Sequence, residues 1–142
     1  MPYSDEITPK ETEAEGQNLA VLAESLYVAN LLILPLLAFL VLVFVFITRH
    51  HDAAPLAKSH LEQTVSASLI FGFLMILIFG LIFILNLEGM TDTTLWIIGV
   101  ILFTIIHAAM VLFGVIGLAK AMAGKTWPYP VLGRTFLSRL LK

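Results

Sequence analysis

The residues best suited to chemistry lie in one short polar segment, "RHHDAAPLAKSHLEQT", which covers residues 49–64. Histidine and carboxylate oxygen are good ligands for zinc and related metals, and His50, His51, Asp52 and His60 supply both. Metal ligands on one helix are usually three or four residues apart, so that both face one ion. Here two histidines are adjacent, and the third follows nine residues later across a proline. We therefore predict no metal ligand in this segment and interpret it as a polar hinge between two membrane helices.

His107 is the second candidate, because it lies near the middle of a long apolar segment. An ionisable group inside a membrane is costly, and it suggests a functional role by default. A neutral imidazole is cheaper and needs only one hydroxyl or carbonyl from a neighbouring helix. Two interpretations therefore stand, a structural hydrogen bond or a role as a ligand, as a haem ligand or in proton transfer. No carboxylate lies at a similar depth, so a proton relay would lack its second member, and we favour the structural interpretation.

The elements that carry these residues are membrane spans. The chain has 142 residues, of which 59% are hydrophobic and 13% charged, against roughly a quarter charged in soluble domains. Three apolar segments, at about 26–48, 65–87 and 93–119, are long enough to cross a hydrocarbon core of about 30 Å. The sequence therefore predicts an all-α integral membrane protein with three transmembrane helices. Pro35 lies inside the first and predicts a bend there.

Charge divides the chain into three regions: an acidic flexible arm at 1–17, the three-span bundle at 18–123 and a basic tail at 124–142. In the tail, "VLGRTFLSRLLK" places apolar residues on one helical face and bases around the other. This pattern predicts a short C-terminal interfacial amphipathic helix, although a tail with fortuitous spacing is the alternative. The membrane-surface residues would be Trp127, Arg134, Arg139 and Lys142.

The distribution of lysine and arginine predicts the orientation in the membrane. The segment after the first span and the tail together hold seven basic residues, whereas the side of the amino terminus holds only Lys10. Because cytoplasmic segments are enriched in lysine and arginine, the first loop and the tail are expected in the cytoplasm. We thus predict a multi-pass protein of a bacterial inner membrane, with its amino terminus outside and its carboxyl terminus in the cytoplasm.

Small and polar residues mark the expected helix contacts. In lipid, helices associate through close approach at small residues and through interhelical hydrogen bonds. We expect the small-residue faces of the second and third spans to meet, with His107 pointing into the bundle and Asn30 reaching another span. The predicted packing or polar contacts are Asn30, Ser68, Gly72, Gly80, Gly99, His107, Gly114 and Gly117.

Several classes of function are excluded by what the sequence lacks. It has no cysteine, so thiolate metal sites and cysteine nucleophiles are absent. No nucleophile elbow, phosphate loop, dinucleotide fingerprint or paired carboxylate occurs. Basic residues are too few and too close to the membrane for nucleic-acid binding. We predict no enzymatic activity, no catalytic residue and no cofactor.

Two motifs suggest a family. A polar loop ends in "HLEQ" at the start of one span, and the last span ends in "GLAKAMAGKTWPYP". Residues 20–131 therefore resemble bacterial relatives of the Tic-type import subunit of the chloroplast inner envelope, a largely uncharacterised group. The positions that carry this resemblance are His60, Gln63, Ala119, Lys120, Ala121, Gly124, Tyr129 and Pro130. The chloroplast relatives are similar to four-span proteins, and no catalytic residues come with the resemblance.

The sequence thus favours a non-enzymatic small membrane protein, an accessory or assembly subunit that packs against a larger membrane complex. Its expected partners are the lipid bilayer and either other membrane subunits or further copies of itself. The alternative is a small transport or protein-translocation component, as a single chain or as a homo-oligomer. The third hypothesis is an enzyme or a haem-binding protein.

Overall fold

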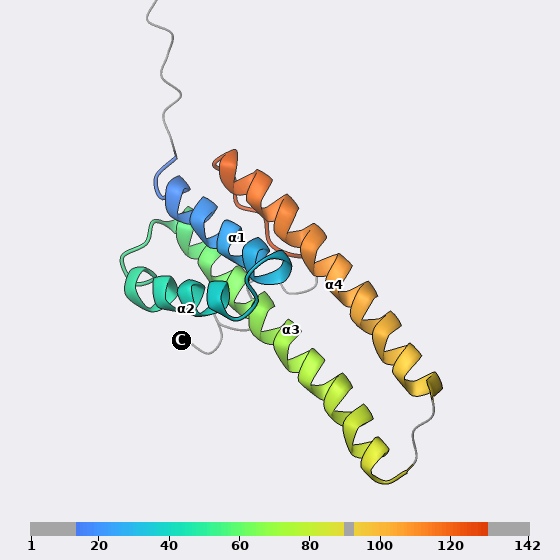
Figure 1. Ribbon diagram of the computed structural model, residues 1–142. Coiled ribbons are helices and arrows are strands. Elements are labelled where there is room, and N and C mark those ends of the chain that lie inside the picture. Colours follow the sequence, from blue (N-terminus) through green and yellow to red (C-terminus); the bar gives the residue numbers. More distant parts are fainter. Residues whose placement is uncertain (1–13, 90–92, 131–142) are drawn as a thin grey trace, which may run out of the picture.

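The structure, a computed structural model, describes residues 14–89 and 93–130. This part of the chain forms four helices and no strand: α1 (Gln17–Leu32), α2 (Leu37–Arg49), α3 (Pro55–Leu87) and α4 (Thr93–Met122). α3 and α4 run in opposite directions and project together as an arm (Figure 1). α1 and α2 pack against one end of this pair and build a head with it. The prediction of an all-helical fold is confirmed.

Two helices in the described part of the chain, α3 and α4, are long and apolar enough to cross a membrane. At about 1.5 Å per residue, α3 is about 50 Å long, which exceeds a hydrocarbon core of about 30 Å. Most side chains between Leu56 and Ser68 are buried in the head, whereas many from Leu69 onward are exposed along the arm. α3 therefore belongs to both parts of the molecule.

The first predicted span, 26–48, is not a single helix. The chain breaks between α1 and α2 at residues 33–36, and Leu36 has a φ of 68°, in the left-handed region. Pro35 favours this break, and the N–H of Leu36 donates to Oδ1 of Asn30 at 3.1 Å. α2 then turns away and crosses α3 (Figure 1). Thirteen residues make α2 too short to cross the hydrocarbon core, so the expected bend is a break and three continuous spans are not found.

α1 packs through one stripe of its surface. Its buried residues are Ala20, Ala23, Glu24 and Tyr27, spaced three or four apart, which places them on one helical face. The two alanines allow the backbones of neighbouring helices to approach closely. α1 contacts both α3 and α4, so this face lies at the centre of the head.

The start of α1 lies beside the end of α4. The amide Nε2 of Gln17 donates to the carbonyl oxygen of Met122 at 2.6 Å. A Cβ atom on Gly124 would lie 3.0 Å from the Cβ of Ala14. The start of α1 and the end of α4 therefore meet at one end of the molecule, whereas the predicted topology separated them by the membrane. The reason is the break at residues 33–36, after which α2 does not continue in the direction of α1 (Figure 1).

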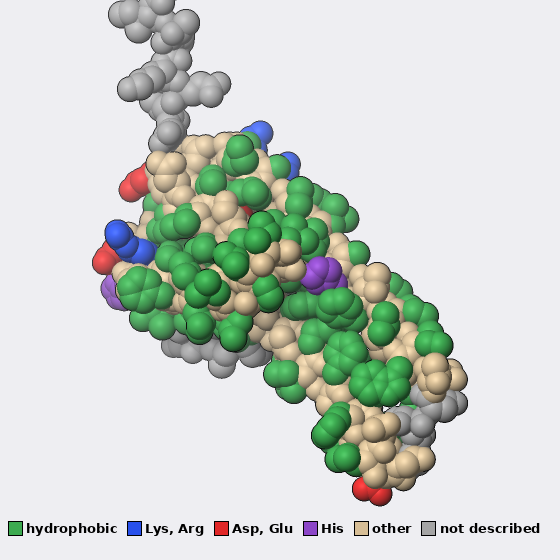
Figure 2. All heavy atoms as spheres, in the orientation of Figure 1, with side chains coloured by type: hydrophobic (Ala, Val, Ile, Leu, Met, Phe, Trp, Pro, Cys, Tyr) green, Lys and Arg blue, Asp and Glu red, His purple; other side chains and the backbone are tan. Residues whose placement is uncertain are grey.

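The distribution of side chains follows this division into head and arm. Hydrophobic side chains cover much of the visible head and the arm, and charged side chains gather at the outer end of the head and at the tip of the arm (Figure 2). This pattern is that of a membrane protein with polar ends. The predicted amphipathic helix, with Arg134, Arg139 and Lys142, and most of the acidic arm lie outside the described residues.

Candidate functional site

The carboxyl group of Glu24 is fully buried where α1, α3 and the segment after α4 meet. Nε2 of Gln63 donates to its Oε1 at 2.6 Å, and the hydroxyl of Tyr129 donates to its Oε2 at 2.6 Å. Nδ1 of His60 lies 2.6 Å from the same Oε1. We call these four residues the Glu24 cluster.

The hydrogen bonds of His60 fix the number of protons in the cluster. Its Nε2 lies 3.1 Å from the carbonyl oxygen of Lys125, which can only accept, so Nε2 carries a proton. Nδ1 and Oε1 of Glu24 could not lie 2.6 Å apart unless one proton lies between them. The pair is therefore neutral as a whole, whichever atom holds this proton. Neutrality and complete pairing are what allow two ionisable groups to be buried together.

Two local structures bring the cluster together. His60 and Gln63 are three residues apart on α3, so both face α1. At the end of α4 the N–H of Lys125 bonds to the carbonyl of Lys120 at 2.9 Å, and Gly124 has a φ of 64°. This is a Schellman turn, which needs a left-handed residue after the helix. The turn reverses the chain, so that Lys125 reaches His60 and Tyr129 reaches Glu24.

Two glycines on α4 make room for α1. A Cβ atom on Gly117 would lie 2.6–2.8 Å from the carboxyl atoms of Glu24, and one on Gly114 would lie 2.9 Å from the ring of Tyr27. The hydroxyl of Tyr27 reaches the carbonyl of Met110 on α4 at 3.4 Å. Both glycines therefore serve the contact between α1 and α4.

The Glu24 cluster is closed to solvent. Glu24 and His60 have no exposed surface, Tyr129 is 1% exposed and Gln63 is 4% exposed. Burial, with a smaller contribution from Glu24, raises the pKa of Tyr129 above its usual range, so its hydroxyl remains a donor. A substrate cannot reach these atoms in this conformation. The hydrogen bonds of the cluster therefore have a structural role: they join α1, α3 and the segment after α4.

The histidines of the polar hinge have separate environments. Nε2 of His50 lies 2.9 Å from Oε1 of Glu62, and His51, almost fully exposed, lies near Asp52 at 3.4 Å. His60 alone enters the Glu24 cluster. Within residues 14–89 and 93–130, no three metal-ligating side chains gather at one point.

The small-residue faces do not meet as we expected. Gly99 faces Ile82 of α3, but Gly114 and Gly117 face α1. A Cβ atom on Gly72 or Gly80 would meet nothing within 4 Å. Aromatic side chains contribute to the contact between α3 and α4. One such contact is the pair Phe79 and Phe103, whose ring centroids are 6.2 Å apart.

His107 lies among these aromatic rings. Its ring stacks on Phe103 at 5.2 Å between centroids and lies 5.7 Å from Phe71. Its buried Nδ1 has no hydrogen-bond partner within the described part of the chain. The predicted structural hydrogen bond is therefore not found. Asn30 does not reach another span through its carbonyl either, because Oδ1 accepts from Leu36 within the α1–α2 break.

Trp127 is partly buried and packs against the core of the head. Its ring lies 6.4 Å from Phe113 and 5.7 Å from Tyr129. This contact holds the segment after α4 against the helices.

Sequence reasoning missed Glu24, because an acid near the start of an apolar segment resembles an interfacial residue. A signal was present in the spacing of its partners. His60 and Gln63 lie on one face of a helix, and Gly114 and Gly117 repeat that spacing on another. Glu24 is the one acid on the helical face that carries Ala20, Ala23 and Tyr27. It is therefore the residue that a polar face on α3 and a glycine face on α4 would be expected to surround.

The fold and the site define a class, a small all-helical membrane protein whose head is joined by a buried, neutral polar cluster. A family model extends the identification. Residues 15–136 match the magnetosome magnetite crystal formation protein family, MamF/MmsF, and the chain belongs to this family. The resemblance to Tic-type import subunits is therefore wrong. No curated protein and no solved structure matches the chain.

The residues that suggested the wrong family nevertheless have a structural role. His60, Gln63 and Tyr129 belong to the Glu24 cluster, and Lys120 and Gly124 form the turn that closes it. Pro130 directly follows Tyr129. The residues of the two motifs thus meet in one structural cluster, and they do not indicate the function of an import subunit.

Proposed function

We propose that this protein is a non-enzymatic accessory subunit of the magnetosome membrane that acts in magnetite crystal formation. The family match over residues 15–136 carries this proposal. The Glu24 cluster supports a non-enzymatic role, because its ionisable groups are fully paired and closed to solvent. Catalysis would require at least one of them to reach a substrate.

The proposed topology has two spans, with both ends of the chain in the cytoplasm. All eight lysines and arginines lie before residue 59 or after residue 119. These parts of the chain are connected to the head and not to the tip of the arm. The connection at 88–92 has Glu88 and Asp92 and no base. By the positive-inside rule the outer end of the head faces the cytoplasm, and the tip of the arm lies across the membrane. α1 and α2 then enter the membrane from the cytoplasmic side and return to it.

This topology makes a direct prediction for labelling. In sealed inside-out membrane vesicles, a cysteine in place of Glu15 should react with a membrane-impermeant thiol reagent, and one in place of Glu88 should not. Both positions are exposed, so only the side of the membrane distinguishes them. Intact spheroplasts should give the opposite pattern. Labelling of Glu15→Cys from outside would restore the three-span topology.

The role in crystal formation is tested by deletion and complementation in the host. Loss of the gene should change the size or number of magnetite crystals seen by electron microscopy, and the wild-type chain should restore them. A Glu15→Ala chain should also restore them, whereas Glu24→Ala should not, because the head would lose its central partner. Immunoblotting of isolated magnetosomes shows whether each chain reaches that membrane. Normal crystals in the deletion strain would refute the proposal.

A further inference from the structure

The head and the arm differ in the number of helices that lie side by side. In the head, α1 packs against α2, α3 and α4, and α2 also packs against α3. Along the described part of the arm, α3 and α4 run together without a third helix (Figure 1). A helix with its side chains is about 10 Å across, so each added helix takes roughly 80 Å² of cross-section. The head is accordingly broader than the arm (Figure 2).

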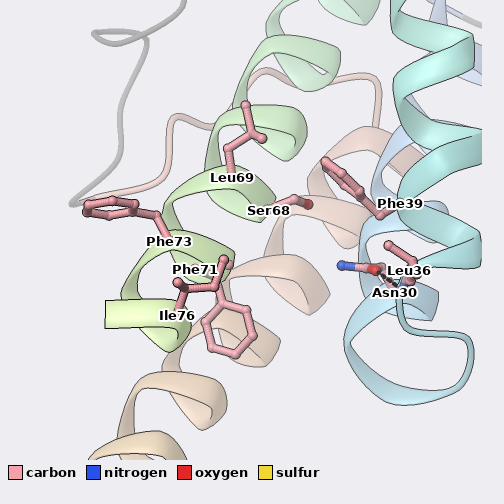
Figure 3. Close-up of a pocket in the computed structure, with 9 residues that line it drawn as sticks. Asn30, Leu36, Phe39, Ser68, Leu69, Phe71, Phe73 and Ile76 are labelled. Atoms are coloured by element: carbon pink, nitrogen blue, oxygen red, sulfur yellow. Dashed lines mark hydrogen bonds between the residues drawn. The ribbon is translucent and has the colours of Figure 1, made fainter. Parts of the chain in front are cut away.

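Helices α1 and α2, which we call the α1–α2 hairpin, reach only half-way across the membrane. Glu88 fixes the tip of the arm at one membrane surface, because a carboxylate is costly in hydrocarbon. Where α1 ends and α2 begins, Asn30 and Phe39 line a cavity with α3, whose residue nearest the tip there is Ile76 (Figure 3). Ile76 precedes Leu87 by eleven residues, about 16 Å of helix, and half of a hydrocarbon core is about 15 Å. The α1–α2 hairpin therefore does not enter the half of the membrane next to the tip.

The outer face of α2 is apolar and uncovered. Five large apolar side chains recur on it at helical spacing and are 42–73% exposed: Leu37, Leu40, Val41, Phe44 and Ile47. The opposite face carries the buried Ala38 and Leu42. At the end of α2, Nε2 of His50 lies 2.9 Å from Oε1 of Glu62, which precedes the apolar part of α3. Hydrophobic side chains continue from the visible head onto the arm (Figure 2), so the acyl chains of one leaflet cover the outer face of α2.

We propose that this protein prefers curved membrane, with the leaflet that surrounds the α1–α2 hairpin on the convex side. Two added helices enlarge that leaflet only, and apolar insertions into one leaflet are sensitive to membrane curvature. Under the topology proposed above this leaflet is the cytoplasmic one, so many copies would bend the membrane towards the cytoplasm. The preference itself follows from the unequal widths of head and arm, and it depends neither on that topology nor on the role in crystal formation.

The chain has no cysteine, so a single introduced cysteine can report the orientation of each copy. Glu15→Cys in the head and Glu88→Cys at the tip, both at exposed positions, are made separately in the full chain. Each variant is reconstituted in giant vesicles of phosphatidylcholine, and an impermeant fluorescent thiol reagent is added outside. The reagent labels only those copies whose head, or whose tip, faces outwards. A narrow membrane tube is then pulled from the vesicle, which makes the outer leaflet convex.

Copies labelled at Glu15→Cys should be enriched in the tube at least about twofold over the flat membrane, whereas copies labelled at Glu88→Cys should be depleted. The two labels mark the same fold in opposite orientations, so each is the control for the other. Equal distributions of the two labels, or enrichment of the Glu88→Cys label, would overturn the proposal. The labelling of inside-out vesicles tests the topology separately, so the failure of one result is distinguishable from the failure of the other.

A further variant tests the α1–α2 hairpin directly. In the Glu15→Cys chain, Leu40→Asp together with Phe44→Asp places two carboxylates on the outer face of α2, which withdraws this helix from the acyl chains. Both replaced side chains are more than half exposed, so the head keeps its internal contacts. Enrichment in the tube should be lost in this variant, whereas Leu40→Ala together with Phe44→Ala should retain it. Enrichment of the aspartate variant equal to that of its parent chain would also overturn the proposal.

Discussion

Replacing Glu24 by alanine is expected to lower the free energy of unfolding by about 3–5 kcal/mol, the usual cost of breaking a buried ion pair on one side. His60, Gln63 and Tyr129 would all lose their common hydrogen-bond partner at once. Each is at most 4% exposed, so water cannot easily replace the carboxyl group. The removed side chain would also leave a cavity between α1 and α4.

The effect can be measured as the thermal unfolding of the purified protein in a mild detergent. Glu15→Ala is the control, because it removes an exposed acid from the same end of the chain and should leave unfolding unchanged. Glu24→Gln should fall between the two, since the amide retains an acceptor for Tyr129 but places donors opposite Gln63. A Glu24→Ala protein as stable as Glu15→Ala would show that the Glu24 cluster does not hold the head together.

The second large effect is expected from one methyl group on α4. Gly117→Ala places a Cβ atom 2.6–2.8 Å from the carboxyl atoms of Glu24. A carboxyl group at the end of a free side chain would move aside, but this one is held by three partners at 2.6 Å. We expect a loss of about 1–3 kcal/mol of stability, as in overpacked protein cores.

Gly72→Ala provides the matched comparison on α3. Its new methyl group meets nothing within 4 Å, so no contact is strained in a single chain. Alanine also favours a helix over glycine by roughly 0.5–1 kcal/mol. In dilute detergent, where single chains are measured, Gly72→Ala should therefore be neutral or slightly stabilising. Equal losses at Gly117 and Gly72 would mean that the close contact between α1 and α4 is wrong.

Much of the fold was visible in the sequence. Two of the three apolar segments became α3 and α4, which are long and apolar enough to cross a membrane. The first segment has the same composition, but Pro35 and the bond from Leu36 to Asn30 stabilise a break within it. Whether a proline bends or breaks a helix depends on such tertiary bonds, which composition does not reveal.

The candidate site was less predictable. His60, Gln63 and Tyr129 were noticed as parts of two separate motifs, and nothing in either motif indicated that they share a partner. Their partner is Glu24, and Tyr129 lies 105 residues away from it in the chain. Pairing over that distance is determined by how α1 lies against α3 and α4. Periodicity along one helix carries no information about it.

The same separation has a consequence for the order in which the protein is made. Glu24 is synthesised early, and its acceptor atoms are fully paired only when Tyr129 has been added. During most of translation the carboxyl group therefore has an incomplete set of donors, and α1 has no stable place beside the spans. The head can close only after both spans and the Schellman turn at Gly124 exist. Completion of the chain is therefore needed to complete the head, and a product that stops before Tyr129 would retain α3 and α4 but leave Oε2 of Glu24 without its donor.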